Sequence, residues 1–200
     1  MADNTYTQPT SDDQANVYQS GQAYFGLKLG TGASGVGEKL VSCSFYINRV
    51  GSPSGNIYAY VLDSSHQKIS GQTSTNSFNA TTDLSTSTYN EKTFTFDGTH
   101  TLAEGEKIVY EYGDGDGSNY TRARFSSSNQ IDTTALVFFK QHGGSFQEDA
   151  DKDASFTLKT NNVSGGGSGS GSGDSEGDAP TGDGLPQTER LQILSTVVPR

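Results

Sequence analysis

Apolar and polar residues alternate with a period of two along several short stretches of the chain from residue 23 onward. Successive side chains of a β-strand point to opposite faces of a sheet, so this alternation predicts strands that each have one apolar face. No stretch shows a helical period of comparable strength. The clearest apolar faces are Phe25, Leu27 and Leu29; Val41, Cys43, Phe45 and Ile47; and Ile57, Ala59 and Val61.

Further alternating stretches predict strands at 93–96, 107–112, 120–125, 135–139 and 155–158. Segments rich in Gly, Asp, Asn and Ser separate them, and these residue types favour turns. About eight short strands at this spacing predict an all-β fold. The expected architecture is an antiparallel β-sandwich of jelly-roll-like topology.

Two segments of the chain are less regular. Residues 63–92 are rich in Ser, Thr and Asn, so we expect a strand or two with a long loop there. Residues 1–22 are polar and are expected to form an N-terminal arm or an edge strand. The sandwich itself is therefore predicted to span residues 23–162, a length that suits one compact domain.

The composition changes sharply after the last predicted strand. Residues 164–173 contain only Gly and Ser and an acidic stretch follows, so 163–184 are predicted to be a flexible linker. Residues 185–200 are predicted to be an apolar docking peptide, because contiguous apolar surface marks interaction sites. A frayed tail without a role is the alternative. The predicted partner-binding residues are Leu191, Ile193, Leu194, Val197 and Val198.

Four stretches of the chain resemble a group of jelly-roll β-sandwich modules found in prokaryotic surface proteins and phage structural proteins. These stretches read FYINRVGSPSGNIYAYVLD, FTFDGTHTLAEGEKIVYEY, DGSNYTRARF and ALVFF. The resemblance covers about residues 20–160 and implies the sandwich fold, which hosts many activities. The chain contains no Trp, and this departure puts in doubt any transfer of sugar stacking from those modules.

The net charge limits the classes of partner. The formal charge is −10 at pH 7, which argues against nucleic acid, because phosphate binding depends on clustered Lys and Arg. No apolar run approaches the length of a membrane span. The first 22 residues lack the basic start and apolar run of a secretory signal, so none is recognisable in this chain.

One loop contains alternating oxygen donors. Asp114, Asp116 and Ser118 resemble the opening of a calcium loop, and residues 149–153 repeat the spacing of the carboxylates. Neither is an EF-hand, since the first has Phe125 at the twelfth position, where that motif needs Glu. Calcium binding in a sandwich loop is one interpretation. A solvated turn that selects Asp and Gly is the other.

A strand next to this loop offers candidate ligand-binding residues. Tyr120, Arg122 and Arg124 alternate and so share one face, while Tyr58 and Tyr60 share a face of another strand. Aromatic planes beside charged donors and acceptors are suited to saccharide recognition. The same residues are also typical of a polar sheet face or a subunit interface with cation–π pairs.

Catalytic machinery is not visible in the sequence. His66, His100 and His142 are isolated in turn-like contexts, and the chain has no GxSxG motif. Residues 30–35 spell GxGxxG, but a strand rather than a helix is predicted after them, so a nucleotide site is not expected. We therefore expect a protein that is not an enzyme.

These observations favour a structural role. The expected function is a non-enzymatic structural or surface-display protein of a virion or an extracellular assembly, anchored through its C-terminal peptide. Its partners would then be other subunits, either copies of itself or a capsid or filament protein. The alternative is a carbohydrate-binding adhesion module, with calcium as the one candidate cofactor.

Overall fold

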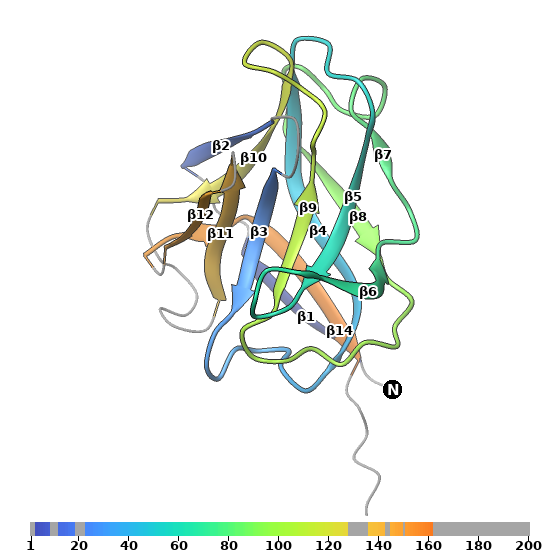
Figure 1. Cartoon of the computed structure of the whole chain (residues 1–200), viewed down its shortest axis with the longest axis vertical. Helices are drawn as coiled ribbons and strands as arrows, with labels where there is room; N and C mark the ends of the chain where they lie inside the picture. Colours follow the sequence, from blue (N-terminus) through green and yellow to red (C-terminus); the bar gives the residue numbers. More distant parts are fainter. Residues whose placement is uncertain are drawn as a thin grey trace, which may run out of the picture. The chain divides into compact units, whose positions relative to one another are not determined.

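The computed structural model describes residues 3–8, 12–18, 23–127, 136–142, 145–149 and 151–161. Every regular element among them is a β-strand, and the strands form two antiparallel sheets that pack face to face (Figure 1). This confirms the predicted all-β antiparallel sandwich. The described strands all fall within one unit of the chain, Met1–Gly165. The described residues contain no helix long and apolar enough to span a membrane.

The first sheet, sheet A, has seven strands. They are β1 (Asp3–Gln8), β2 (Asp13–Val17), β4 (Lys39–Val50), β8 (Asn90–Thr95), β10 (Tyr120–Ser126), β13 (Asp153–Ala154) and β14 (Phe156–Asn161).

The second sheet, sheet B, also has seven strands. They are β3 (Tyr24–Leu29), β5 (Asn56–Leu62), β6 (Lys68–Thr73), β7 (Phe78–Asn79), β9 (Lys107–Glu111), β11 (Leu136–His142) and β12 (Ser145–Asp149).

The long strand β4 organises sheet A. One of its edges pairs with β8, and its other edge pairs first with β14 and then with β10. β10 pairs with β2 along its remaining edge, and β1 pairs with the outer edge of β14. The backbone of β10 is therefore hydrogen-bonded on both sides over much of its length.

Sheet B has the order β12-β11-β3-β9-β5-β6, and β7 pairs with the first residues of β5. The connections from β3 to β4 and from β4 to β5 each cross from one sheet to the other, as do those from β8 through β9 and β10 to β11. Residues that are close in the sequence are thus divided between the two layers. Each outer face of the sandwich is assembled from strands that are distant in the sequence.

The apolar faces predicted from the alternation meet between the sheets. Phe45 of β4 packs against Phe25 of β3 and Tyr110 of β9, with ring centroids 6.1 and 5.6 Å apart. Phe94 of β8 packs on Phe45 from within sheet A, at 6.3 Å. Cys43 is fully buried in the same core, and burial raises the pKa of its thiol. It acts as a small apolar residue rather than as a nucleophile.

Observed strands lie at each of the five further stretches that alternation predicted. The polar first 22 residues contain β1 and β2, which pair with sheet A, and residues 63–92 contain β6 and β7. β12 and β13 were not predicted. β12 has no period-two pattern, and it forms because its backbone finds a partner in β11.

Candidate functional site

The outer face of sheet A carries a cluster of tyrosine and arginine side chains. Along β10, Ala123 and Phe125 enter the core, so the intervening Arg122 and Arg124 point to the opposite face together with Tyr120. The structure thus brings the predicted residues Tyr120, Arg122 and Arg124 together. Two residues from elsewhere join them, and we call the set the tyrosine–arginine cluster: Tyr18, Tyr89, Tyr120, Arg122 and Arg124.

Each arginine of this cluster packs on a tyrosine. The Cζ atom of Arg122 lies 5.4 Å from the ring centroid of Tyr120, and its Nη2 donates a hydrogen bond to the Tyr120 hydroxyl at 3.1 Å. The Cζ atom of Arg124 lies 4.4 Å from the ring centroid of Tyr89. Tyr18 packs beside Tyr120 with ring centroids 5.3 Å apart. Stacking on rings holds the guanidinium planes in place while leaving N–H donors at their edges.

The residues of this cluster lie on β10 and at the ends of two other strands of sheet A, β2 and β8. Tyr18 directly follows β2, and Tyr89 directly precedes β8. The Tyr89 hydroxyl donates to the side-chain carbonyl of Gln14 on β2, so its ring extends across the sheet face toward the far side of β10. Burial raises the pKa of the Tyr89 hydroxyl, and the hydrogen bond with Tyr120 raises the pKa of Arg122. Arg122 therefore stays charged at any physiological pH.

Two buried polar atoms beside the cluster have no hydrogen-bond partner among the described residues. Asn48 of β4 is directly opposite Arg122 in the β4–β10 register, and only 4% of its surface is exposed. The acceptor Oδ1 of Asn48 and the donor Nε of Arg122 are both unsatisfied. Buried polar groups are normally paired, so each unsatisfied atom needs an explanation.

The other two predicted ligand-binding tyrosines lie on the outer face of sheet B. Tyr58 is partly exposed, while the ring of Tyr60 lies under Lys68, whose Nζ is 3.7 Å from the ring centroid. Lys68 also forms an ion pair of 2.7 Å with Glu111. Burial, followed by the nearby Glu111 carboxylate, raises the pKa of Tyr60 to about 12. Tyr58 and Tyr60 therefore do not share a surface with the tyrosine–arginine cluster.

The predicted calcium residues lie in the turn between β9 and β10. Oδ1 of Asp116 accepts hydrogen bonds from the backbone amides of Ser118 at 2.7 Å and of Asn119 at 2.8 Å. These bonds, with those from the Asn119 side chain, lower the pKa of Asp116. A Cβ on Gly55, which has a φ of +86°, would lie 2.3 Å from Oδ2 of Asp114. The turn between β9 and β10 is therefore closely packed against the turn before β5. The Asp116 side chain closes the turn between β9 and β10.

No three His, Cys, Asp or Glu side chains are grouped to hold a metal ion in the ranges that the structure describes. Calcium at Asp114, Asp116 and Ser118 stays a prediction. Melting curves of the full chain in chelator and in excess calcium test it, because a bound ion raises the melting temperature. Asp116→Ala should remove any such rise, and identical curves for the unmodified chain would contradict calcium binding.

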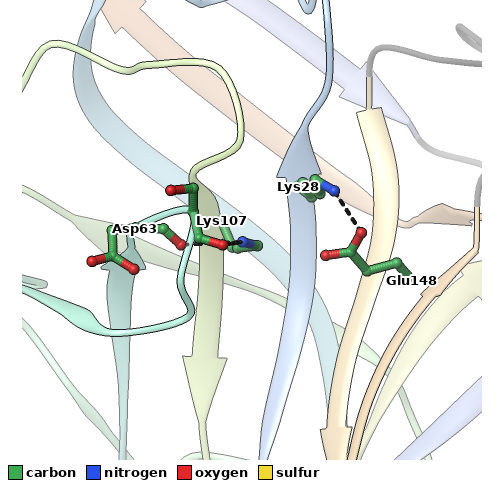
Figure 2. A network of polar contacts seen from close by, with 5 residues as sticks. Lys28, Asp63, Lys107 and Glu148 are labelled. Atoms are coloured by element: carbon green, nitrogen blue, oxygen red, sulfur yellow. Dashed lines mark hydrogen bonds and ion pairs between the residues drawn. The ribbon is translucent and has the colours of Figure 1, made fainter.

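A polar network on sheet B was not predicted from the sequence (Figure 2). Lys107 of β9 is buried, and its Nζ donates to the backbone carbonyls of Asp63 at 3.1 Å and Ser64 at 2.9 Å. Burial lowers the pKa of this ammonium group. Beside it, Lys28 of β3 forms an ion pair of 2.5 Å with Glu148 of β12.

This network joins distant parts of sheet B. The ring of Phe146 on β12 stacks on His66 in the β5–β6 turn, with centroids 3.9 Å apart. No sequence signal could have found these contacts, because they join four segments that are far apart in the chain. The arrangement holds β12 and the turn against the sheet.

The predicted docking peptide, with Leu191, Ile193, Leu194, Val197 and Val198, lies outside the described residues, as does the linker. No family model, no curated protein and no solved structure matches this chain.

Proposed function

We propose that the chain is a non-enzymatic structural or surface-display protein of a larger assembly, such as a virion or an extracellular surface, anchored through its C-terminal peptide. The supporting observation is that carboxylates of the chain accept hydrogen bonds from the backbone amides of its turns. Several carboxylates of the described residues hold turns: Asp63 Oδ1 accepts the amides of Ser65 and Gln67 at 2.8 and 2.9 Å, and Asp116 closes the turn before β10 in the same way.

The histidine–carboxylate pair of His100 and Glu106 serves a turn too. His100 Nε2 lies 2.9 Å from Oε2 of Glu106, and the same oxygen accepts the backbone amide of Ala103 at 3.0 Å. Glu106 is buried and directly precedes β9. A rigid sandwich with loops closed by its own side chains suits display, in which a fixed body is held at the end of a tether.

The test concerns the C-terminal peptide. Changing Ile193 and Val197 together to Asp in the full chain should release it from its assembly, because several apolar side chains would lose their burial. Sedimentation of the full chain with particles from its source measures the release. Circular dichroism should show an unchanged β-sheet body.

The matched control places the same two charges in the linker, as Ser168→Asp with Ser170→Asp, and this variant should remain bound. Normal incorporation of the Ile193→Asp and Val197→Asp variant would contradict anchoring by the peptide. Attention would then turn to the N-terminal strands β1 and β2.

The tyrosine–arginine cluster favours a second candidate function, carbohydrate binding. It combines aromatic planes, stacked guanidinium groups and a buried amide with an unsatisfied acceptor on the outer face of one sheet. Retention of the full chain in native gels that contain a polysaccharide tests this candidate. Migration unchanged by any polysaccharide would contradict it.

A further inference from the structure

Within the part of the chain that the structure describes, the two arginines of the cluster lack carboxylate partners, although the chain is rich in carboxylates. The sequence has 23 Asp and Glu residues against 13 Lys and Arg, so any cation has many candidate partners. Within the described ranges, neither Arg122 nor Arg124 forms an ion pair, whereas Lys28, Lys68 and Lys152 each do. Two adjacent positive groups thus remain available on one face of an otherwise acidic protein.

The unsatisfied atoms beneath the cluster give an independent reason to look for a ligand. Arg122 Nε needs an acceptor and Asn48 Oδ1 needs a donor, and both atoms are shielded from solvent. Tyr89 stands one residue beyond the Asn90–Ile47 pair, which places it next to Asn48. A ligand that binds these atoms has to offer both donors and acceptors.

The position of the cluster within the sheet argues against a peptide that binds by strand addition. Such a peptide forms its backbone hydrogen bonds with an exposed edge of a sheet. β10 is paired with β2 on one side and with β4 on the other over Thr121–Ala123, so it offers no free backbone edge there. The cluster is polar and aromatic, which suits a hydroxylated ligand.

We infer that the tyrosine–arginine cluster binds the carboxylate groups of an acidic polysaccharide, a polymer that contains uronic acids. Arg122 and Arg124 bind carboxylates through the N–H edges of their guanidinium groups, which match carboxylate geometry. Their positions on β10 are about 7 Å apart, which suits a polymer with repeated carboxylates. A sugar hydroxyl supplies the donor that Asn48 lacks. This inference rests on the carbohydrate-binding candidate and names its ligand class.

Affinity electrophoresis of the full chain tests the inference at about 0.15 M salt, where charges beyond about 8 Å are screened. Separate gels contain polygalacturonate, neutral dextran or polyglutamate. We expect polygalacturonate to retain the chain. This retention has to overcome long-range repulsion, because the protein and the polymer both carry a net negative charge. Arg122→Gln with Arg124→Gln should raise the dissociation constant for polygalacturonate about tenfold or more.

Lys159→Gln is the matched control. Lys159 is exposed on β14 of the same sheet, and its neighbour Leu158 lies in the core, so Lys159 is on the same outer face. This variant loses a positive charge and should keep its affinity. Arg124→Lys keeps the charge but not the planar group, and it should bind several-fold more weakly while it remains folded. If the double variant fails to fold, the affinity of Arg124→Lys for polygalacturonate is the measurement that tests the inference.

Four results would overturn the inference, and they separate its failure from that of carbohydrate binding itself. Equal retention of the double variant and the unmodified chain by polygalacturonate excludes the two arginines. Retention by polyglutamate as strong as by polygalacturonate identifies an acidic peptide as the ligand. Retention by dextran alone keeps carbohydrate binding but rejects the acidic ligand. Retention by none of the polymers rejects both.

Discussion

The two outer faces of the sandwich differ in the partners of their positively charged side chains. On sheet B, Lys28 and Lys68 each contact a carboxylate within 2.7 Å, and Lys107 is buried against two backbone carbonyls. On sheet A, Arg122 and Arg124 contact tyrosine rings and hydroxyls, and no carboxylate of the described residues pairs with them. Among the described residues, Lys28 and Lys68 of sheet B are thus paired with carboxylates, whereas Arg122 and Arg124 of sheet A are not.

We interpret this difference as one between a structural face, on sheet B, and the proposed recognition face, on sheet A. Ion pairs and buried hydrogen bonds on sheet B connect β3, β9, β12 and the β5–β6 turn, so their loss should lower stability. Cation–π stacking on sheet A fixes the direction of the guanidinium groups at a small energetic gain. Substitutions on sheet B should therefore change stability more than those on sheet A, and those on sheet A should change binding.

The largest expected effect is that of Gly26→Ala on sheet B. A Cβ at Gly26 would lie 2.0 Å from the carbonyl oxygen of Ile108 on the neighbouring strand β9. We expect a loss of about 3 kcal/mol in the free energy of unfolding, because backbone has to move. Chemical denaturation measures the loss. Gly117→Ala, where a Cβ meets nothing within 4 Å, is the control, and equal stability of both variants would contradict the close approach of β3 and β9.

Lys107→Met should have the next largest effect. It keeps the length of the side chain but leaves the carbonyls of Asp63 and Ser64 without the donors they have now. The expected loss is about 2 kcal/mol. Lys68→Met removes a more exposed ion pair and should cost about 0.5 kcal/mol. Similar losses for both in denaturation experiments would show that the sheet B network is not a structural device.

Arg124→Gln on sheet A should have a smaller effect on stability. It removes the stacking on Tyr89, a contact worth about 0.5–1 kcal/mol. A loss above about 2 kcal/mol in the same denaturation experiment would place Arg124 among the structural residues. The distinction between the two faces would then fail.

The smallest expected effect on stability is the loss, at acid pH, of the contribution from Asp116 in the turn before β10. Amide hydrogen bonds from Ser118 and Asn119 lower the pKa of Asp116 below its ordinary value of 3.8. Its contribution to stability is therefore fully present above about pH 4 and is lost as the pH falls through the lowered folded pKa. Carbon-13 NMR titration measures this pKa. A value at or above 3.8 would contradict the turn geometry, and Asp116→Asn should abolish the titration step.

Part of the candidate site follows from the sequence. Arg122 and Arg124 are two residues apart in one strand, so period-two alternation alone places them on one face with Tyr120. Tyr18, Tyr89 and Asn48 come from other parts of sheet A, and pairing of distant strands brings them to β10. Register across a sheet depends on the whole core, and so these three residues were not predictable.

The sequence by itself determined the strands of the core and the all-β class, because alternation of side chains is a local property of each segment. Only the tertiary structure decided the chemical use of the polar residues. Asp116 accepts amides of its own turn, and the ammonium group of Lys107 is buried against two backbone carbonyls. The physical reason is that burial and hydrogen-bond partners are set by strands and turns far away in the chain, which no local pattern encodes.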